Sequence, residues 1–175
     1  PGVLQMPEVD PELLHTQTLA LLDAAIDELV RGREREGEKL AEIIRQRCDG
    51  ILDIVTQLRE LIPEIKQSWR DKLQGRLSEI KAELDASRLE QEMAIMAQKI
   101  DVDEELDRLQ THIAEVQRVL QHNKPIGRRL DFLMQELNRE ANTLGSKSVD
   151  ARTGTASVDL KVLIEQMREQ VQNIE

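Results

Sequence analysis

The sequence predicts an all-α protein in which long antiparallel helices form an elongated helical bundle. Aromatic residues make up only 1% of the 175 residues, so the core must consist of aliphatic side chains, which suit packed helices better than sheets. Three of the five prolines fall within the first eleven residues and leave the interior free for helices. Apolar residues recur at steps of three and four, which is the spacing of one helix face.

Composition limits the classes of function. Hydrophobic residues make up 39% of the chain, which is enough to form a core and argues against a disordered protein. The net charge of −10 excludes attraction to nucleic acid by bulk charge, so such a role needs a local basic surface. No apolar run approaches the roughly 20 residues that cross a membrane, and we expect no membrane partner. The single Cys48 excludes an internal disulfide and suits a reducing compartment.

Residues 1–99 are predicted to form a long helical hairpin or coiled-coil-like region. Asp10 followed by Pro11 predicts a helix start, because the carboxylate can cap and proline is tolerated at the first helical position. Helical spacing of apolar residues follows to about Arg31. Gly32 and Gly37 then predict a turn or a weakened helical joint, and we favour a bend. The first residue is a proline, and we expect a fragment of a larger two-domain chain.

The longest apolar pattern runs from Leu40 to Leu84 and is close to a heptad seam. Pro63 should bend this helix or end it near Ile62. The seam has more apolar surface than a short hairpin hides, so we expect part of it to be buried between subunits. A further helix is predicted over residues 86–99.

Residues 100–175 are predicted to form a C-terminal helical region. A helix should begin at Asp101 or Asp103, where "DVDE" offers a capping pattern. A second helix is expected over about residues 126–144, a polar loop over residues 145–157, and a terminal helix capped by Ser157.

The stretch "GRRLDFLMQELNREANTLGSKS", residues 127–148, is the densest in polar side chains. At 100° per residue its apolar positions share one arc, which predicts a buried face: Leu130, Leu133, Met134, Leu137, Ala141 and Leu144. A second, narrower arc beside it contains Arg129, Glu136, Glu140 and Thr143.

Glu136 and Glu140 are four residues apart, so their carboxylates should be neighbours and repel each other. A nearby arginine or a divalent cation would remove that penalty. An ordinary solvated face with Glu–Arg pairs explains the same pattern. Residues 124–148 carry five cationic and three anionic side chains, so this part of an acidic chain is locally basic.

Several segments together resemble one known family. They are "PGVL", "RLEQEMAIMAQKIDVDEELDRLQTH", "GRRLDFLMQELNREANTLGSKS" and "LKVLIEQMREQVQNIE". The chain resembles the C-terminal half of the YicC/YloC family of bacterial endoribonucleases over essentially its whole length. This resemblance implies a divalent-metal-dependent enzyme that cleaves single-stranded or structured RNA in the cytoplasm and assembles as a ring-like homohexamer. It also implies an N-terminal domain that is absent from these 175 residues.

Metal-assisted cleavage of a phosphodiester needs carboxylates for the ion and cations for the phosphates. We assign Glu136 and Glu140 as ligands of Mg²⁺ or Mn²⁺ and as catalytic residues. The predicted RNA-binding residues are Arg128, Arg129, Arg139, Asn142 and Lys147. With so few aromatic residues, base stacking is not expected to be the main grip on RNA, so we expect recognition of backbone or shape.

His112 is the third catalytic candidate, because it lies one turn after Arg108 and an imidazole can serve as a base or a metal ligand. A lone helical histidine is more often structural. The acids at positions 101, 103, 104, 105 and 107 could also bind metal, but helix capping accounts for most of them. No phosphate-binding loop, zinc-ligand spacing or serine-nucleophile motif is present.

A second function of another class stays open. The long seam and the charge of −10 also suit a helical oligomerisation module, with catalysis mainly in the absent N-terminal domain.

Overall fold

A computed structural model describes residues 10–79, 91, 94, 101–122 and 125–173. Four helices account for most of them: α1 (Pro11–Glu79), α3 (Asp103–Val119), α4 (Gly127–Ser146) and α5 (Ala151–Val171). No strand occurs among the described residues, and the predicted all-α class is confirmed. None of the described helices is both long and apolar enough to cross a membrane.

The chain divides into two compact units, one up to Lys39 and one from Leu40 onward, and α1 contributes to both. The predicted division of the chain lies between residues 99 and 100, which are both outside the described residues. The predicted helix over residues 86–99 also lies there, apart from Gln91 and Ala94, which are helical.

In the first unit, α1 begins as predicted. The Asp10 carboxylate accepts a hydrogen bond from the backbone N–H of Glu12 at 3.0 Å, and the Asp10 carbonyl accepts one from Leu14 at 3.0 Å. The large apolar side chains of this unit are 48–72% exposed: Leu13, Leu14, Leu19, Leu21, Leu22, Ile26, Leu29 and Val30. The apolar pattern of this segment therefore marks a face that the described chain leaves open to solvent.

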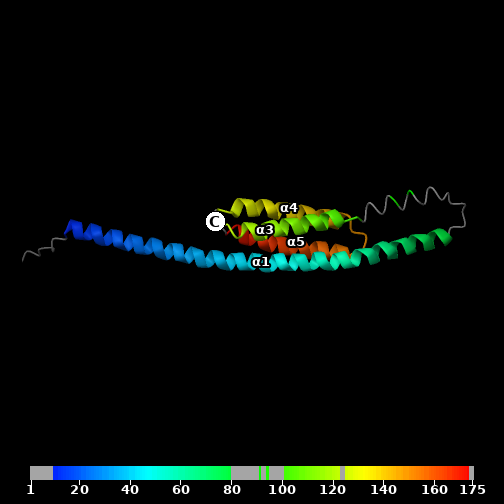
Figure 1. Ribbon diagram of the computed structural model, residues 1–175, viewed down its shortest axis with the longest axis horizontal. Coiled ribbons are helices and arrows are strands. Elements are labelled where there is room, and N and C mark those ends of the chain that lie inside the picture. The colour runs from blue at the N-terminus through cyan, green and yellow to red at the C-terminus, as the bar shows by residue number, and fades with distance from the viewer. Residues whose placement is uncertain (1–9, 80–90, 92–93, 95–100, 123–124, 174–175) are drawn as a thin grey trace, which may run out of the picture. The chain divides into compact units, whose positions relative to one another are not determined.

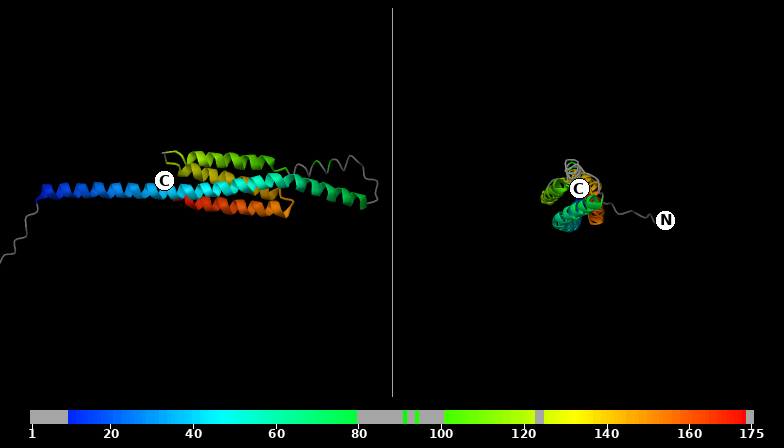
Figure 2. Two further views of the ribbon diagram at one scale, coloured as in Figure 1. Left: turned by 60° about the horizontal axis from the view of Figure 1, so that its bottom comes forward. Right: turned by 90° about the vertical axis from the view of Figure 1, so that its right-hand side faces the viewer.

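From Leu40 onward, α1 packs with α3, α4 and α5 as an antiparallel four-helix bundle, in which successive helices reverse direction (Figures 1 and 2). α4 lies against both α3 and α5. On the other side, Arg59 of α1 pairs with Asp107 of α3, and Arg152 of α5 pairs with Glu64 of α1 at 3.0 Å.

The predicted heptad seam is the α1 contribution to the core. Its buried residues follow alternating steps of four and three: Ile44, Cys48, Ile51, Val55, Leu58, Ile62 and Ile65. This stretch is covered by α3, α4 and α5 of the same chain, so the expectation that it is buried between subunits is wrong for Ile44 to Ile62. Burial, with a smaller contribution from the Asp49 charge, raises the pKa of the Cys48 thiol to about 12.

α1 continues through Gly32, Gly37 and Pro63, so a turn at the two glycines and a helix end near Ile62 are both wrong. A glycine in a helix costs about 1 kcal/mol, which the strong helix formers around "REREGEK" outweigh. Pro63 is exposed, so the carbonyl group that loses its helical partner there can reach water. The axis of α1 changes direction over its blue-green part, near residue 60 on the colour bar, as expected for a proline kink (Figure 1).

The helix starts in the C-terminal region differ from the predicted ones. α3 begins at Asp103, as expected, but its N-cap residue is Val102, whose side chain makes no capping hydrogen bond. The Asp101 carboxylate instead accepts a long hydrogen bond from the backbone N–H of Asp103 at 3.4 Å. Most of the predicted loop over residues 145–157 is also wrong: α4 extends to Ser146, and α5 begins at Ala151 with the Asp150 carboxylate accepting from the backbone N–H of Arg152.

Ser157 is a contact residue between α4 and α5 rather than a cap. It is 2% exposed, and its hydroxyl donates a hydrogen bond to the backbone carbonyl of Ala141 at 2.8 Å. The two helices come so close here that a Cβ atom on Gly145 would lie 2.6 Å from Ser157 Oγ. The small residues "GS" and "TAS", which suggested a loop, allow this close approach.

We predict that Gly145→Ala lowers the free energy of unfolding by about 1–2 kcal/mol, because overpacking at Ser157 outweighs the gain in helix propensity. Urea denaturation followed by circular dichroism measures the change. Gly154→Ala is the matched control, because a Cβ there meets only Ser148 Oγ at 3.5 Å and should stabilise α5. Equal stability of both variants would contradict the predicted clash.

Candidate metal centre

The two predicted arcs of α4 are present. Every residue of the predicted apolar arc is buried: Leu130, Leu133, Met134, Leu137, Ala141 and Leu144. In the second arc, Glu136 is half-buried and Glu140 is only 3% exposed. Glu140 is therefore closer to the core than an ordinary solvated face would place it.

His112 of α3 faces the two carboxylates. A ring nitrogen of His112 and one carboxylate oxygen each of Glu136 and Glu140 all lie within 4.8 Å of one another. The antiparallel packing of α3 on α4 brings these three residues together, although His112 is 24 positions from Glu136. They form the one His/Cys/Asp/Glu group in the described part of the chain with this geometry.

Ion pairs flank this group along the contact between α3 and α4. Arg108 Nη1 lies 3.4 Å from Glu140 Oε1, and Lys147 Nζ lies 2.8 Å from Glu105 Oε1. At the other end of the contact, Arg129 Nη2 lies 3.2 Å from Glu115 Oε1. The polar groups of the two helices thus form a row with the three candidate ligands in its middle.

The charges in this row are strongly coupled. Hydrogen bonds from Arg118 lower the pKa of the Glu115 carboxyl from its ordinary 4.5 to about 2, with a smaller contribution from Arg129. The hydrogen bond to Glu140, and then that to Glu104, raises the pKa of Arg108. Glu105 is 6% exposed, and its Oε2 has no hydrogen-bond partner within the described residues, so Lys147 is its main compensation.

The donor set fits a divalent transition-metal ion. Two carboxylate oxygens and one imidazole nitrogen suit Mn²⁺, whereas Mg²⁺ takes oxygen ligands almost exclusively. Glu140 is nearly fully buried, and the hydrogen bond that it accepts from Arg108 is long, at 3.4 Å. Two carboxylates so close together, one of them buried, call for additional positive charge, which a metal ion would supply.

The acids of the α3 N-terminus are a weaker alternative, because each lies beside a cation. Arg59 pairs with Asp107, and Lys66 Nζ lies 3.8 Å and 3.5 Å from carboxylate oxygens of Asp101 and Asp103. The remaining two, Glu104 and Glu105, pair with Arg108 and Lys147.

The predicted RNA-binding residues fall into three groups. Arg128 and Arg139 are exposed and have no ion pair within the described residues. Arg129 and Lys147 are held by Glu115 and Glu105, as described above. Asn142 lies roughly 160° round α4 from Glu140 and hydrogen-bonds Asn138 at 2.9 Å, so it is not brought to the candidate centre.

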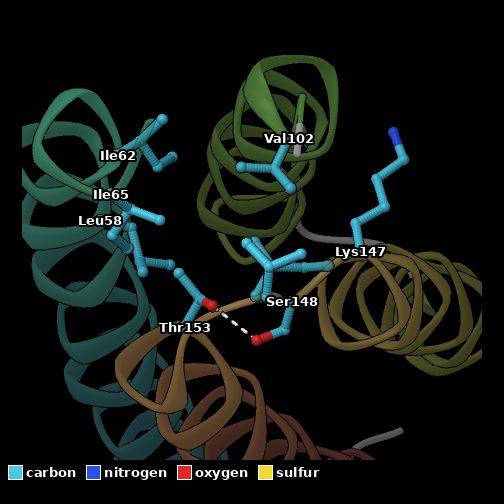
Figure 3. A pocket seen from close by; sticks show the side chains of 9 residues that line it. Leu58, Ile62, Ile65, Val102, Lys147, Ser148 and Thr153 are labelled. Carbon is cyan, nitrogen blue, oxygen red and sulfur yellow. Dashed lines mark hydrogen bonds between the residues drawn. The ribbon is translucent and has the colours of Figure 1, made fainter. Parts of the chain in front are cut away.

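At the end of the stretch over residues 127–148, Lys147 and Ser148 line a narrow apolar pocket rather than the metal centre (Figure 3). The pocket has room for roughly one water molecule. Its apolar lining is Leu58, Ile62, Ile65, Val102, Leu144 and Val149. Ser148 Oγ and Thr153 Oγ1 are 2.6 Å apart, while the Lys147 side chain extends away from the other labelled side chains (Figure 3). This segment therefore joins α4 to α5.

Sequence reasoning placed Arg108 one turn before His112 and counted Glu105 among the acids that could bind metal, but it missed Glu115. The spacing of Glu115, three residues after His112 on the same helix side, was the available signal. The partners of all three residues on α4 could not be predicted, because they depend on how the two helices are aligned.

Known proteins identify the family. The sequence profile described as "Endoribonuclease YicC-like, C-terminal" matches residues 58–175, which include all three candidate ligands. The chain belongs to the YicC-like endoribonuclease family.

Two curated relatives agree with this assignment. The chain is 47% identical to the "Probable endoribonuclease YicC" of Haemophilus influenzae, over 100% of this chain and 61% of that protein. It is 37% identical to the "Probable endoribonuclease YicC" of Clostridioides difficile, over 98% of this chain and 60% of that protein. The chain thus spans about three-fifths of the length of these YicC relatives.

We predict that Glu115→Gln makes the acid stability of the bundle less dependent on pH. The folded-state pKa of Glu115 is depressed, so its stabilising contribution is complete above about pH 4.5 and is lost as the pH falls towards 2. Urea unfolding at several pH values should therefore show a shallower loss between pH 4.5 and 2 in this variant. Glu60→Gln, at an exposed position of α1, should keep the wild-type slope, and identical slopes for all three proteins would refute the assignment.

Proposed function

We propose that this chain carries the metal centre of an endoribonuclease that hydrolyses phosphodiester bonds in single-stranded or structured RNA. The observation that supports this proposal most directly is the convergence of His112, Glu136 and Glu140 within 4.8 Å. The family and the printed names of both relatives point to the same class of activity.

The proposed centre holds Mn²⁺ through His112, Glu136 and Glu140. A bound divalent ion there would polarise the scissile phosphate and lower the pKa of a bound water. Glu136 is half-buried and is the more accessible of the two carboxylates, so it faces the side from which the phosphate would arrive. Glu140, the one buried member of the group, would hold the ion from the bundle side.

The cations of the row have separate tasks in this proposal. Arg108 places a positive charge 3.4 Å from Glu140 and orients that buried carboxylate from the α3 side. Arg128 and Arg139 are exposed without ion pairs in the described chain, and they contact phosphates on either side of the cut. Lys147 neutralises Glu105 and so positions the C-terminal end of α4.

We predict that Glu136→Gln and Glu140→Gln each weaken Mn²⁺ binding at least ten-fold and lower RNA cleavage to a similar or greater extent, because each removes a charged ligand. Isothermal titration with Mn²⁺ measures binding, and a fluorescently labelled RNA hairpin with a single-stranded tail reports cleavage by the full-length protein. Glu165→Gln removes an exposed carboxylate of α5 from a pair with Arg168 and should change neither readout. Full cleavage by both α4 variants at saturating Mn²⁺ would end this assignment and favour catalysis elsewhere in the full-length protein.

We also propose that the protein works as a homo-oligomer, a ring of six by the family resemblance, in the bacterial cytoplasm, where the free Cys48 thiol stays reduced. The supporting observation is the open apolar face of the first unit, because large contiguous apolar surfaces on soluble proteins mark interaction sites. At 100° per residue, Leu19, Leu22, Ile26, Leu29 and Val30 share an arc of about 100°.

Light scattering of the 175-residue chain tests this self-association. We expect a species larger than the 20.0 kDa monomer, and we expect Leu22→Asp with Ile26→Asp to reduce its mass without unfolding the bundle. Glu28→Gln is the control, because Glu28 lies on the side of the same segment opposite this arc. A monomeric wild-type chain would refute self-association of this half and leave the face to another part of the full-length protein.

A further inference from the structure

Phe132 is an exposed aromatic residue in a chain that has almost none. It is one of two aromatic residues in the sequence, and it is 48% exposed on α4, outside the buried arc. A phenyl ring stabilises a core in proportion to the apolar area that is buried, so the exposed part of Phe132 contributes little to the stability of the bundle. Its position therefore calls for another explanation than packing.

The ring lies next to the candidate metal centre. Phe132 is four residues before Glu136 and eight before Glu140, so the three side chains follow one side of α4 at successive turns. One helical turn is about 5.4 Å, which places the ring within the reach of the nucleotide next to one bound at the metal.

One cation lies over the ring, and two more lie along the same side of α4. The guanidinium carbon of Arg129 lies 5.8 Å from the ring centroid, and Arg129 is itself held by Glu115 at 3.2 Å. Arg128, four positions before Phe132, and Arg139, seven after it, lie on the same side of α4 and are exposed without ion pairs in the described residues. A flat apolar surface bordered by cations has the chemistry of a nucleobase between two phosphates.

We propose that Phe132 is a stacking platform for one unpaired nucleobase of the RNA, next to the phosphate that is cut. This inference rests on the proposed function and adds the form of the substrate to it. A base can stack on the ring only if it leaves its own helical stack, so the site takes single-stranded RNA at this position. Stacking accepts every base, so little sequence preference is expected there.

The binding test uses short single-stranded RNAs and fluorescence anisotropy with the full-length protein. Ca²⁺ replaces Mn²⁺ in these measurements, and gel analysis confirms that the RNA stays intact. Phe132→Ala should weaken binding about 5- to 150-fold, the range expected for one stacked base. Phe132→Trp should restore it, and Phe132→Leu, which keeps the apolar bulk without an aromatic face, should not.

A series of RNAs with one abasic position each identifies the stacked nucleotide. Wild-type protein should lose affinity at one abasic position, and Phe132→Ala should show no loss there. The salt dependence separates stacking from charge: Phe132→Ala should keep the slope of log affinity against log salt, whereas Arg139→Ala should reduce it by about 0.7. Equal abasic profiles for wild type and Phe132→Ala would overturn the proposal.

The remaining outcomes separate this inference from its premise. If Glu136→Gln abolishes cleavage while the abasic profiles are equal, the metal centre stands and the platform is wrong. If Phe132→Ala changes the mass measured by light scattering and leaves RNA affinity unchanged, the ring is a contact between copies of the chain and the platform is again wrong. If Glu136→Gln and Glu140→Gln both cleave normally at saturating Mn²⁺, the proposed metal centre fails, whatever the abasic profiles show.

Discussion

The buried carboxylate of Glu140 is the constraint on which the rest of the candidate site depends. With 3% of its surface exposed, this carboxyl group loses most of its hydration, and the bundle must supply hydrogen bonds and charge in return. Arg108 reaches it from α3, and His112 lies beside it. This part of α3 therefore provides polar partners for the carboxylate as well as apolar side chains for the core.

The parts of the fold that follow from a single helix could be predicted from the sequence. The seam from Ile44 to Ile65 and the buried arc of α4 each need only the spacing of apolar residues, and both were predicted correctly. The beginning of α5 could not be predicted in this way, because its first turns use small and polar residues to approach α4. Ser157 is buried through a hydrogen bond to Ala141, and such a contact has no apolar signature in sequence.

In the candidate site, too, features within one helix could be predicted and features that depend on two helices could not. Glu136 and Glu140 are neighbours on one helix, so their proximity follows from their spacing. His112 joins them only because α3 and α4 run antiparallel with one particular alignment, which spacing within one helix does not specify. The predicted RNA-binding residues were not told apart in sequence. In the structure, Arg128 and Arg139 are exposed, Arg129 and Lys147 are held in ion pairs, and Asn142 lies away from the candidate centre. Their differences come from their partners on α3 and their places round α4.

The row of ion pairs between α3 and α4 also sets the register of the two helices, that is, which residues lie opposite one another. A slip of one turn in one direction would place Lys147 opposite Arg108 and Arg129 opposite Arg118. A slip in the other direction would place Glu140 opposite Glu104. Both alternatives juxtapose like charges, whereas apolar contacts of similar size would tolerate either one. The outer pairs thus fix the distance between His112 and the two glutamates, although they lie outside that group themselves.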